Sequence, residues 1–133
     1  MWLTIVRMAK TAPLGASLAA PGAPVAATEA VTFTLSTPDT VAVDGCSPIE
    51  LERREDDRWV AIPRVPCPNV VAATEIASSL TLSLPPPAPG DYRAVAALGT
   101  GCAAALPFAL AGCAGLDIVR SPTFTVLAPV AKP

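Results

Sequence analysis

The chain is predicted to be an all-β, antiparallel sandwich of about seven strands, and three observations support this fold class. Sixteen prolines in 133 residues argue against long helices, because proline removes a main-chain donor and clashes with the preceding turn. Short segments in which apolar and hydroxyl residues alternate recur along the chain, as expected for half-buried strands. Four cysteines without a single histidine fit a disulfide-stapled scaffold from an oxidising compartment.

Alternation with a period of two marks the strands in order. Residues 31–35 alternate Val, Phe and Leu with Thr, so one face of this strand is buried and the other carries hydroxyls. Residues 80–84 repeat the pattern with leucines, and the proline-rich turn at 85–90 ends that strand. A strand over 91–98 and a closing strand over 123–127 complete the clear elements.

The best-defined hairpin turns at residues 56–57. Pairing outward from this turn places Arg54 opposite Trp59 and Leu51 opposite Ile62, and this register gathers the apolar residues on one face of both strands. Trp59 then falls on the other face. We expect it to pack there beneath Arg54, with an exposed recognition aromatic as the alternative interpretation.

The cysteines are symmetric about two chain reversals. Cys46 and Cys67 are equidistant from the turn of that hairpin, and Cys102 and Cys113 are equidistant from residues 107–108. We therefore predict the disulfides 46–67 and 102–113, each closing a hairpin or loop. Four cysteines allow three connectivities, so this pairing is an inference from symmetry. A zinc site is disfavoured because the spacing lacks two closely spaced Cys-x-x-Cys pairs.

Three regions are expected along the chain. Residues 1–29 are predicted to be an export signal or a flexible Ala/Pro leader, residues 30–128 the sandwich, and residues 129–133 a tail. As a signal, the leader would be cut after Val-Ala-Ala at 25–27. As a leader, it would carry the apolar run at 2–6, which is too short to span a membrane but long enough for an edge strand. No transmembrane segment is expected.

The composition argues against several classes of function. Without histidine there is no Ser–His or Cys–His nucleophile, and the net charge of −2 with no basic stripe argues against nucleic acid. The acidic residues of 50–57 are interleaved with arginines, which indicates cross-strand pairing on a solvated hairpin rather than paired-carboxylate catalysis or calcium binding. We expect no enzyme activity, no cofactor and no metal.

The order of these segments resembles the small bacterial immunoglobulin-like domains of envelope and secreted proteins over about residues 30–128. The segments that carry the resemblance lie at 31–35, 49–53, 58–63, 80–82, 89–93 and 122–126. It implies an immunoglobulin-like sandwich that displays, spaces or binds, usually without catalysis. Tyr92, which follows Pro-Gly, resembles a tyrosine corner, in which a buried ring bonds nearby main chain. The chain is also similar, more weakly, to the bacterial intracellular proteinase-inhibitor domain.

One segment is a candidate binding site. The loop between Cys102 and Cys113 is almost wholly apolar and contains Leu106, Phe108 and Leu110. On a disulfide-restricted loop these side chains would form a patch that binds a partner at little entropic cost. In the alternative interpretation the loop folds back and plugs the open end of the sandwich with the same side chains.

The leading functional hypothesis is an immunoglobulin-like module, secreted or held in the envelope or periplasm, that contacts another protein or acts as a spacer. Contact would use the 102–113 loop or a sheet edge. The first alternative is a subunit of a surface filament or layer, with residues 2–6 added to a neighbour's sheet. The second is a protease inhibitor presenting the 102–113 loop. The sequence indicates neither the partner nor the oligomeric state.

Overall fold

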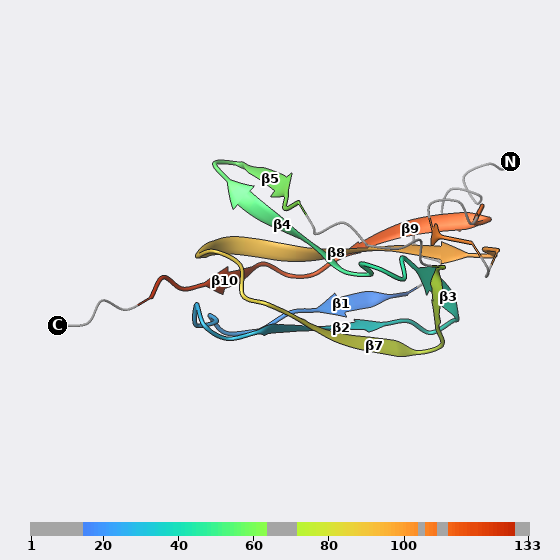
Figure 1. Cartoon of the computed structure of the whole chain (residues 1–133), viewed down its shortest axis with the longest axis horizontal. Coiled ribbons are helices and arrows are strands. Elements are labelled where there is room, and N and C mark those ends of the chain that lie inside the picture. The colour runs from blue at the N-terminus through green and yellow to red at the C-terminus, as the bar shows by residue number, and fades with distance from the viewer. Residues whose placement is uncertain (1–14, 64–71, 104–105, 109–111, 130–133) are drawn as a thin grey trace, which may run out of the picture.

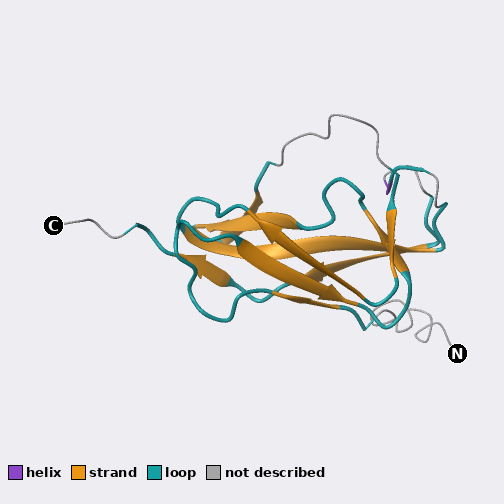
Figure 2. Ribbon diagram, turned by 60° about the horizontal axis from the view of Figure 1, so that its bottom comes forward, coloured by secondary structure: helices purple, strands orange, loops and turns teal. Residues whose placement is uncertain are grey.

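The computed structural model describes residues 15–63, 72–103, 106–108 and 112–129. Within these ranges the chain forms ten strands in antiparallel sheets and no α-helix, which confirms the all-β fold class. The short helical segment drawn in Figure 2 is a 3₁₀ turn at Phe108. The strands are β1 (Ser17–Ala19), β2 (Val31–Ser36), β3 (Val41–Val43), β4 (Glu50–Glu55), β5 (Arg58–Ala61), β6 (Thr74–Ile76), β7 (Ser79–Leu84), β8 (Gly90–Thr100), β9 (Gly115–Arg120) and β10 (Phe124–Val126).

The strands form two layers (Figure 1). A three-stranded sheet has the order β1-β2-β7, and a seven-stranded sheet runs β5-β4-β8-β3-β6, with β9 and β10 also paired to β8. Tyr92 of β8 pairs with Arg53 of β4 and with Phe124 of β10. The long strand β8 is therefore central, with β4 along one side and β10 followed by β9 along the other.

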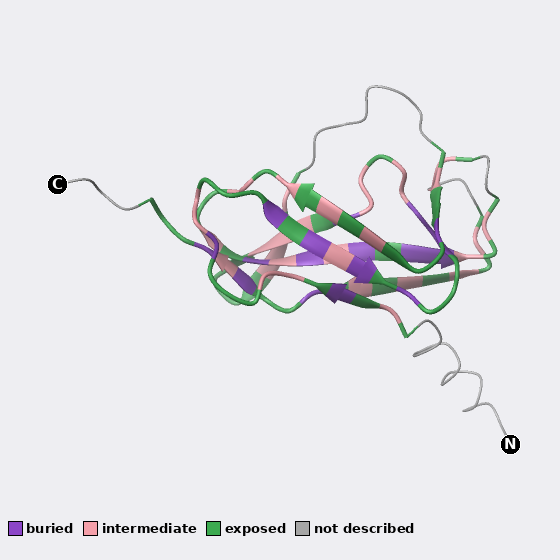
Figure 3. Ribbon diagram, turned by 90° about the horizontal axis from the view of Figure 1, so that it is seen from below, coloured by how far each residue is buried: buried purple, intermediate pink, exposed green. Residues whose placement is uncertain are grey.

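The pair β2–β7 has the two faces expected from its alternating sequence. In the antiparallel register Val31 lies opposite Leu84, so apolar residues of both strands point to the other sheet. Hydroxyls line the outer face, where Thr32 Oγ1 lies 2.8 Å from Ser83 Oγ and Thr34 Oγ1 lies 3.2 Å from Thr81 Oγ1. Figure 3 shows the alternation of buried and exposed residues along the strands.

The core between the sheets is built around three aromatic rings. The Phe33 and Phe124 rings meet edge to face with centroids 5.4 Å apart, and the Tyr92 ring stacks on Phe124 at 5.9 Å. Tyr92 is buried, and its hydroxyl donates to the Ala88 carbonyl at 2.5 Å. The predicted structural role of this tyrosine, a buried ring bonded to main chain four residues upstream, is confirmed.

The β4–β5 hairpin has the predicted register. Arg54 lies opposite Trp59, and the Ile62 amide donates to the Leu51 carbonyl at 2.9 Å. The two-residue turn places Asp56 at φ +57°, a left-handed conformation that aspartate tolerates better than most residues. A local turn and one apolar face were therefore enough to determine this pairing from the sequence.

The sandwich begins earlier than residue 30, which corrects the expectation of a leader through residue 29. Leu18 of β1 is buried in the core, and β1 pairs antiparallel with β2. Val25 then crosses to the other sheet and pairs in parallel with β10: its amide donates to the Thr125 carbonyl at 2.9 Å, and its carbonyl accepts from the Leu127 amide at 2.8 Å. Residues 2–6 and 130–133 lie outside the described residues.

The Ala/Pro-rich composition of this segment concealed its role. A strand of three residues offers too few positions to show alternation, and its single inward side chain, Leu18, is surrounded by small residues. Proline and glycine at 21–24 indicated flexibility, whereas in the structure they lie where the chain crosses from one sheet to the other. No helix in the described part of the chain is long and apolar enough to cross a membrane.

Candidate interaction surface at the β8–β9 hairpin

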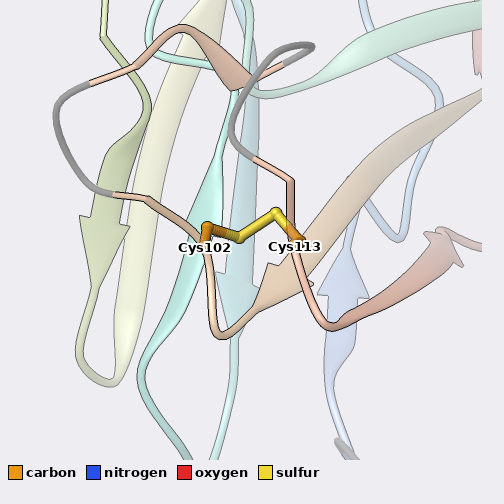
Figure 4. The surroundings of a disulfide bond; sticks show 2 residues. All are labelled: Cys102 and Cys113. Atoms are coloured by element: carbon orange, nitrogen blue, oxygen red, sulfur yellow. A yellow bond between two sulfur atoms is a disulfide. The ribbon is translucent and has the colours of Figure 1, made fainter.

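A disulfide between Cys102 and Cys113 closes the loop that joins β8 to β9, as the cysteine symmetry predicted (Figure 4). Gly101 and Gly112, each directly before one of the bonded cysteines, adopt left-handed conformations with φ of +63° and +60°, which favour glycine. Cys46 is also disulfide-bonded. Its predicted partner, Cys67, lies outside the described residues, so that pairing stays a prediction.

The disulfide lies on the outer face of the seven-stranded sheet, above Gly99. Leu98 points into the core, so Gly99, the next residue of β8, faces outward. A Cβ atom at Gly99 would lie 2.5 Å from Cys113 Sγ and 2.6 Å from Cys102 Sγ. It would also lie 3.1 Å from Cε1 of Phe108. Glycine at this position therefore provides the space in which the disulfide and the Phe108 ring pack on the sheet.

Replacing Gly99 by alanine is expected to destabilise the protein by about 1–3 kcal/mol, the usual cost of overpacking a close-packed site. Urea unfolding of the oxidised protein measures this loss. In a variant with both Cys102 and Cys113 replaced by alanine, the same substitution should have a much smaller effect, because the clashing sulfur atoms are absent. Equal effects in both backgrounds would show that the disulfide does not pack on Gly99.

The three residues predicted to form an apolar patch have different environments. Leu106 is exposed, and its carbonyl accepts a hydrogen bond from the Ala73 amide at 2.9 Å, which ties the loop to the residue before β6. Phe108 is half-buried against Gly99. Leu110 lies outside the described residues. The loop thus places Phe108 on the outer face of the sheet, while Leu106 faces solvent.

Two further apolar residues, which sequence reasoning did not single out, extend this surface. Leu116 and Ile118 of β9 are 70% and 52% exposed. They lie opposite Gly99 and Ala97 of β8, so they share the outer face with the disulfide. We call Phe108, Leu116, Ile118 and the Cys102–Cys113 bond the hairpin surface.

The sequence of β9 alternates Leu and Ile with Asp117 and Val119, so the signal was present. The alternation alone did not show which face of β9 is buried, however, because apolar residues such as Leu and Ile are usually expected to point inward. Pairing with β8 decides otherwise: the outward residues of that strand are the small Ala97 and Gly99, and the residues opposite them must share their face.

Trp59 lies on the same outer face, nearer the other end of the sheet, and is already engaged. The Arg93 guanidinium lies 4.4 Å and that of Arg54 5.9 Å from the centroid of its ring. Arg93 Nε is itself 2.5 Å from Glu52 Oε1 in an ion pair. The predicted packing of Trp59 beneath Arg54 is confirmed, and the ring of this tryptophan contacts a second cation, Arg93.

A second concave feature lies between the β4–β5 hairpin and the end of β7. It is a groove of about 290 Å³ whose walls include Ile49, Leu51, Ile62 and Leu84. Its lining is mostly apolar, with Ser47 and Glu50 as the polar residues. Within the described ranges, no three His, Cys, Asp or Glu side chains gather in a way that could hold a metal ion.

Comparison with protein-family models gives no match for this chain, and comparison with curated proteins also gives none. The assignment of function therefore depends on the fold and on the surfaces described above.

Proposed function

We propose that this protein is a non-catalytic, exported module of the immunoglobulin-like class that contacts another protein through the hairpin surface. The strand order supports the class. A sheet β1-β2-β7 facing a sheet in which β8 lies between β4 and the β9–β10 segment corresponds to the A-B-E and C-F-G sheets of an immunoglobulin sandwich. The Tyr92–Ala88 hydrogen bond corresponds to the tyrosine corner of that class.

The covalent chemistry supports export. The Cys102–Cys113 disulfide closes a loop, and Cys46 is disulfide-bonded as well. Disulfides of this structural kind form and persist in the periplasm, in the envelope and outside the cell, whereas cytosolic thiols are kept reduced. The disulfide here lies on one sheet, whereas the common immunoglobulin disulfide joins the two sheets. Its role is therefore to shape the hairpin surface and not to link the layers of the core.

The main observation that supports the proposed contact is the exposure of Leu116. A leucine that is 70% exposed within a regular ladder contributes little to folding, because most of its side chain stays in water. Leu116, Ile118 and Leu106 are three of the four exposed large apolar residues in the described part of the chain. The concentration of these residues on β9 and on the adjoining disulfide-closed loop is typical of a protein-contact site.

Site-specific photo-crosslinking in producing cells tests the proposed contact. A benzophenone amino acid at Leu116 or Ile118 is expected to give a discrete cross-linked species with one partner protein, because both side chains point outward from β9. The same probe at Ser17, exposed on the outer face of the other sheet, is the matched control. Replacing Cys102 and Cys113 by alanine should weaken the cross-link, since the loop that places Phe108 on the sheet beside Gly99 would no longer be closed.

Cross-linking no stronger at Leu116 than at Ser17 would contradict the proposed contact surface. Cell fractionation tests export separately, because a protein retained in the cytoplasm with all four thiols reduced would contradict an exported module even if a partner were found. The two measurements thus separate the compartment from the binding surface.

A further inference from the structure

The outer edge of β7 is open in the part of the chain that the structure describes. In the three-stranded sheet β7 is the last strand, with β2 on one side and no strand from the described part of the chain on the other. Figure 1 shows β7 at the margin of the layer formed by β1 and β2. An open edge presents unpaired main-chain donors and acceptors, and natural sandwiches usually protect such edges.

Among the described strands that end a sheet, β7 is the one that lacks protection. The strands β1, β5 and β6 have three, four and three residues, and β5 and β6 carry the charged Arg58 and Glu75. In β9 the Ile118 amide donates to its neighbour's carboxylate, Asp117 Oδ1, at 2.9 Å, so that edge donor is occupied. By contrast, β7 is six residues long and contains no charge, no proline and no glycine.

The main-chain donors and acceptors at the open edge are those of the hydroxyl residues of β7. One step beyond the β2–β7 ladder, the Thr37 amide donates to the Ser78 carbonyl at 2.8 Å. Hydrogen-bonded and non-bonded pairs alternate in an antiparallel ladder, so the leucines of β7 bond to β2. The main-chain N–H and C=O groups of Ser79, Thr81 and Ser83 consequently point away from β2, toward the open edge.

The sequence of this edge is complementary to itself. Residues 79–83 read Ser-Leu-Thr-Leu-Ser, which is the same in both directions about Thr81. An antiparallel copy centred on Thr81 would place Thr81 opposite Thr81, leucine opposite leucine and serine opposite serine. The pairs in this register that exchange main-chain hydrogen bonds are those of Ser79, Thr81 and Ser83, the three residues whose donors and acceptors face the edge.

We propose that two copies of this chain associate edge to edge through β7, with Thr81 of one copy opposite Thr81 of the second copy. The two three-stranded sheets then form one continuous sheet of six strands. Leu80 and Leu82 lie on the inner face of both copies, where they are only half-buried in the single chain. The hydroxyls lie together on the outer face, and no charged side chain of β7 is brought near another.

Sedimentation velocity of the full chain over a range of concentrations tests the association. The unmodified protein is expected to dimerise as its concentration rises. Thr81→Pro should leave a monomer, because it removes an N–H that points to the edge and not to β2, a position where edge strands accept proline. Thr81→Val is the matched control: it removes the same hydroxyl but keeps the N–H, and it should still dimerise.

Charge substitutions test the register. Thr81→Lys and Thr81→Glu should each be monomeric, because like charges would face each other across the twofold axis, and an equimolar mixture of the two should recover a dimer. Thr34→Lys adds the same charge on the same face and removes the same Thr34–Thr81 hydroxyl contact, but it lies one strand away from the edge. It should therefore remain dimeric.

A wild-type chain that stays monomeric at every concentration overturns the inference. So does a Thr81→Pro variant that dimerises like wild type, or a mixture of the two charge variants that stays monomeric. The inference is independent of the hairpin surface. A variant with serine at Leu116 and Ile118 should dimerise like wild type, so failure of the proposed contact and failure of the β7 pairing are observed separately.

Discussion

Deleting residues 1–27 is expected to remove a large part of the stability of this protein, whereas deleting residues 1–14 removes none of the contacts in the described part of the chain. The longer deletion removes β1 and the residue that bridges to β10. Leu18 and Val25 both belong to the core, and each fully buried aliphatic side chain contributes about 1.5–3 kcal/mol. The main-chain bonds of Val25 to Thr125 and Leu127 are lost as well.

Together these losses amount to about 5 kcal/mol, against the typical domain stability of about 5–15 kcal/mol. Urea unfolding followed by far-ultraviolet circular dichroism compares the full chain with the two truncated chains. If residues 28–133 alone unfolded at the same urea concentration as the full chain, the leader interpretation would stand and the pairing of β1 would be dispensable. Cleavage after Ala27, as in the signal interpretation, is therefore expected to lower the stability by the same amount, about 5 kcal/mol.

Replacing Tyr92 by alanine is expected to destabilise the protein by about 3–5 kcal/mol, the range found when a buried aromatic ring is truncated. Tyr92 is 1% exposed and stacks on Phe124, so its removal leaves a cavity where the two sheets meet. Thermal unfolding should show a large decrease in the midpoint temperature.

Tyr92→Phe separates the two roles of this side chain. It keeps the ring and removes the hydroxyl that donates to the Ala88 carbonyl, so its expected cost is about 1 kcal/mol. Leu127→Ala, at an exposed site, should change stability little and is the control for truncating a large side chain. A Tyr92→Ala variant as stable as Leu127→Ala would contradict the central position of Tyr92 in the core.

The parts of the fold that could be predicted are those in which one local pattern determines the pairing. In the β4–β5 hairpin, a two-residue turn and a single apolar face allow one register, and the structure has it. The Cys102–Cys113 bond was predicted from the equal distances of the two cysteines from residues 107–108. The burial of Tyr92 and the packing of Trp59 under Arg54 followed from sequence context and pairing.

The parts that could not be predicted depend on contacts between distant residues. Val25 pairs with Val126. These two residues are far apart in the sequence, and a pairing of one residue with one residue leaves no periodic pattern from which it could be predicted. The exposure of Leu116 and Ile118 depends on which residues of β8 lie opposite them. The charged Asp117 indicates that β9 lies at the edge of a sheet, but it does not indicate which face of β9 is buried.

The sequence by itself therefore determined the class of this protein: an all-β chain with at least one hairpin of known register and a disulfide-closed loop. Only the tertiary structure decided where the sandwich begins, which face of β9 meets water and which sheet edge is left open. The physical reason is that alternation defines two faces of a strand but not which one is buried. That choice is made by the strand alongside and the sheet opposite, which lie far away in the sequence.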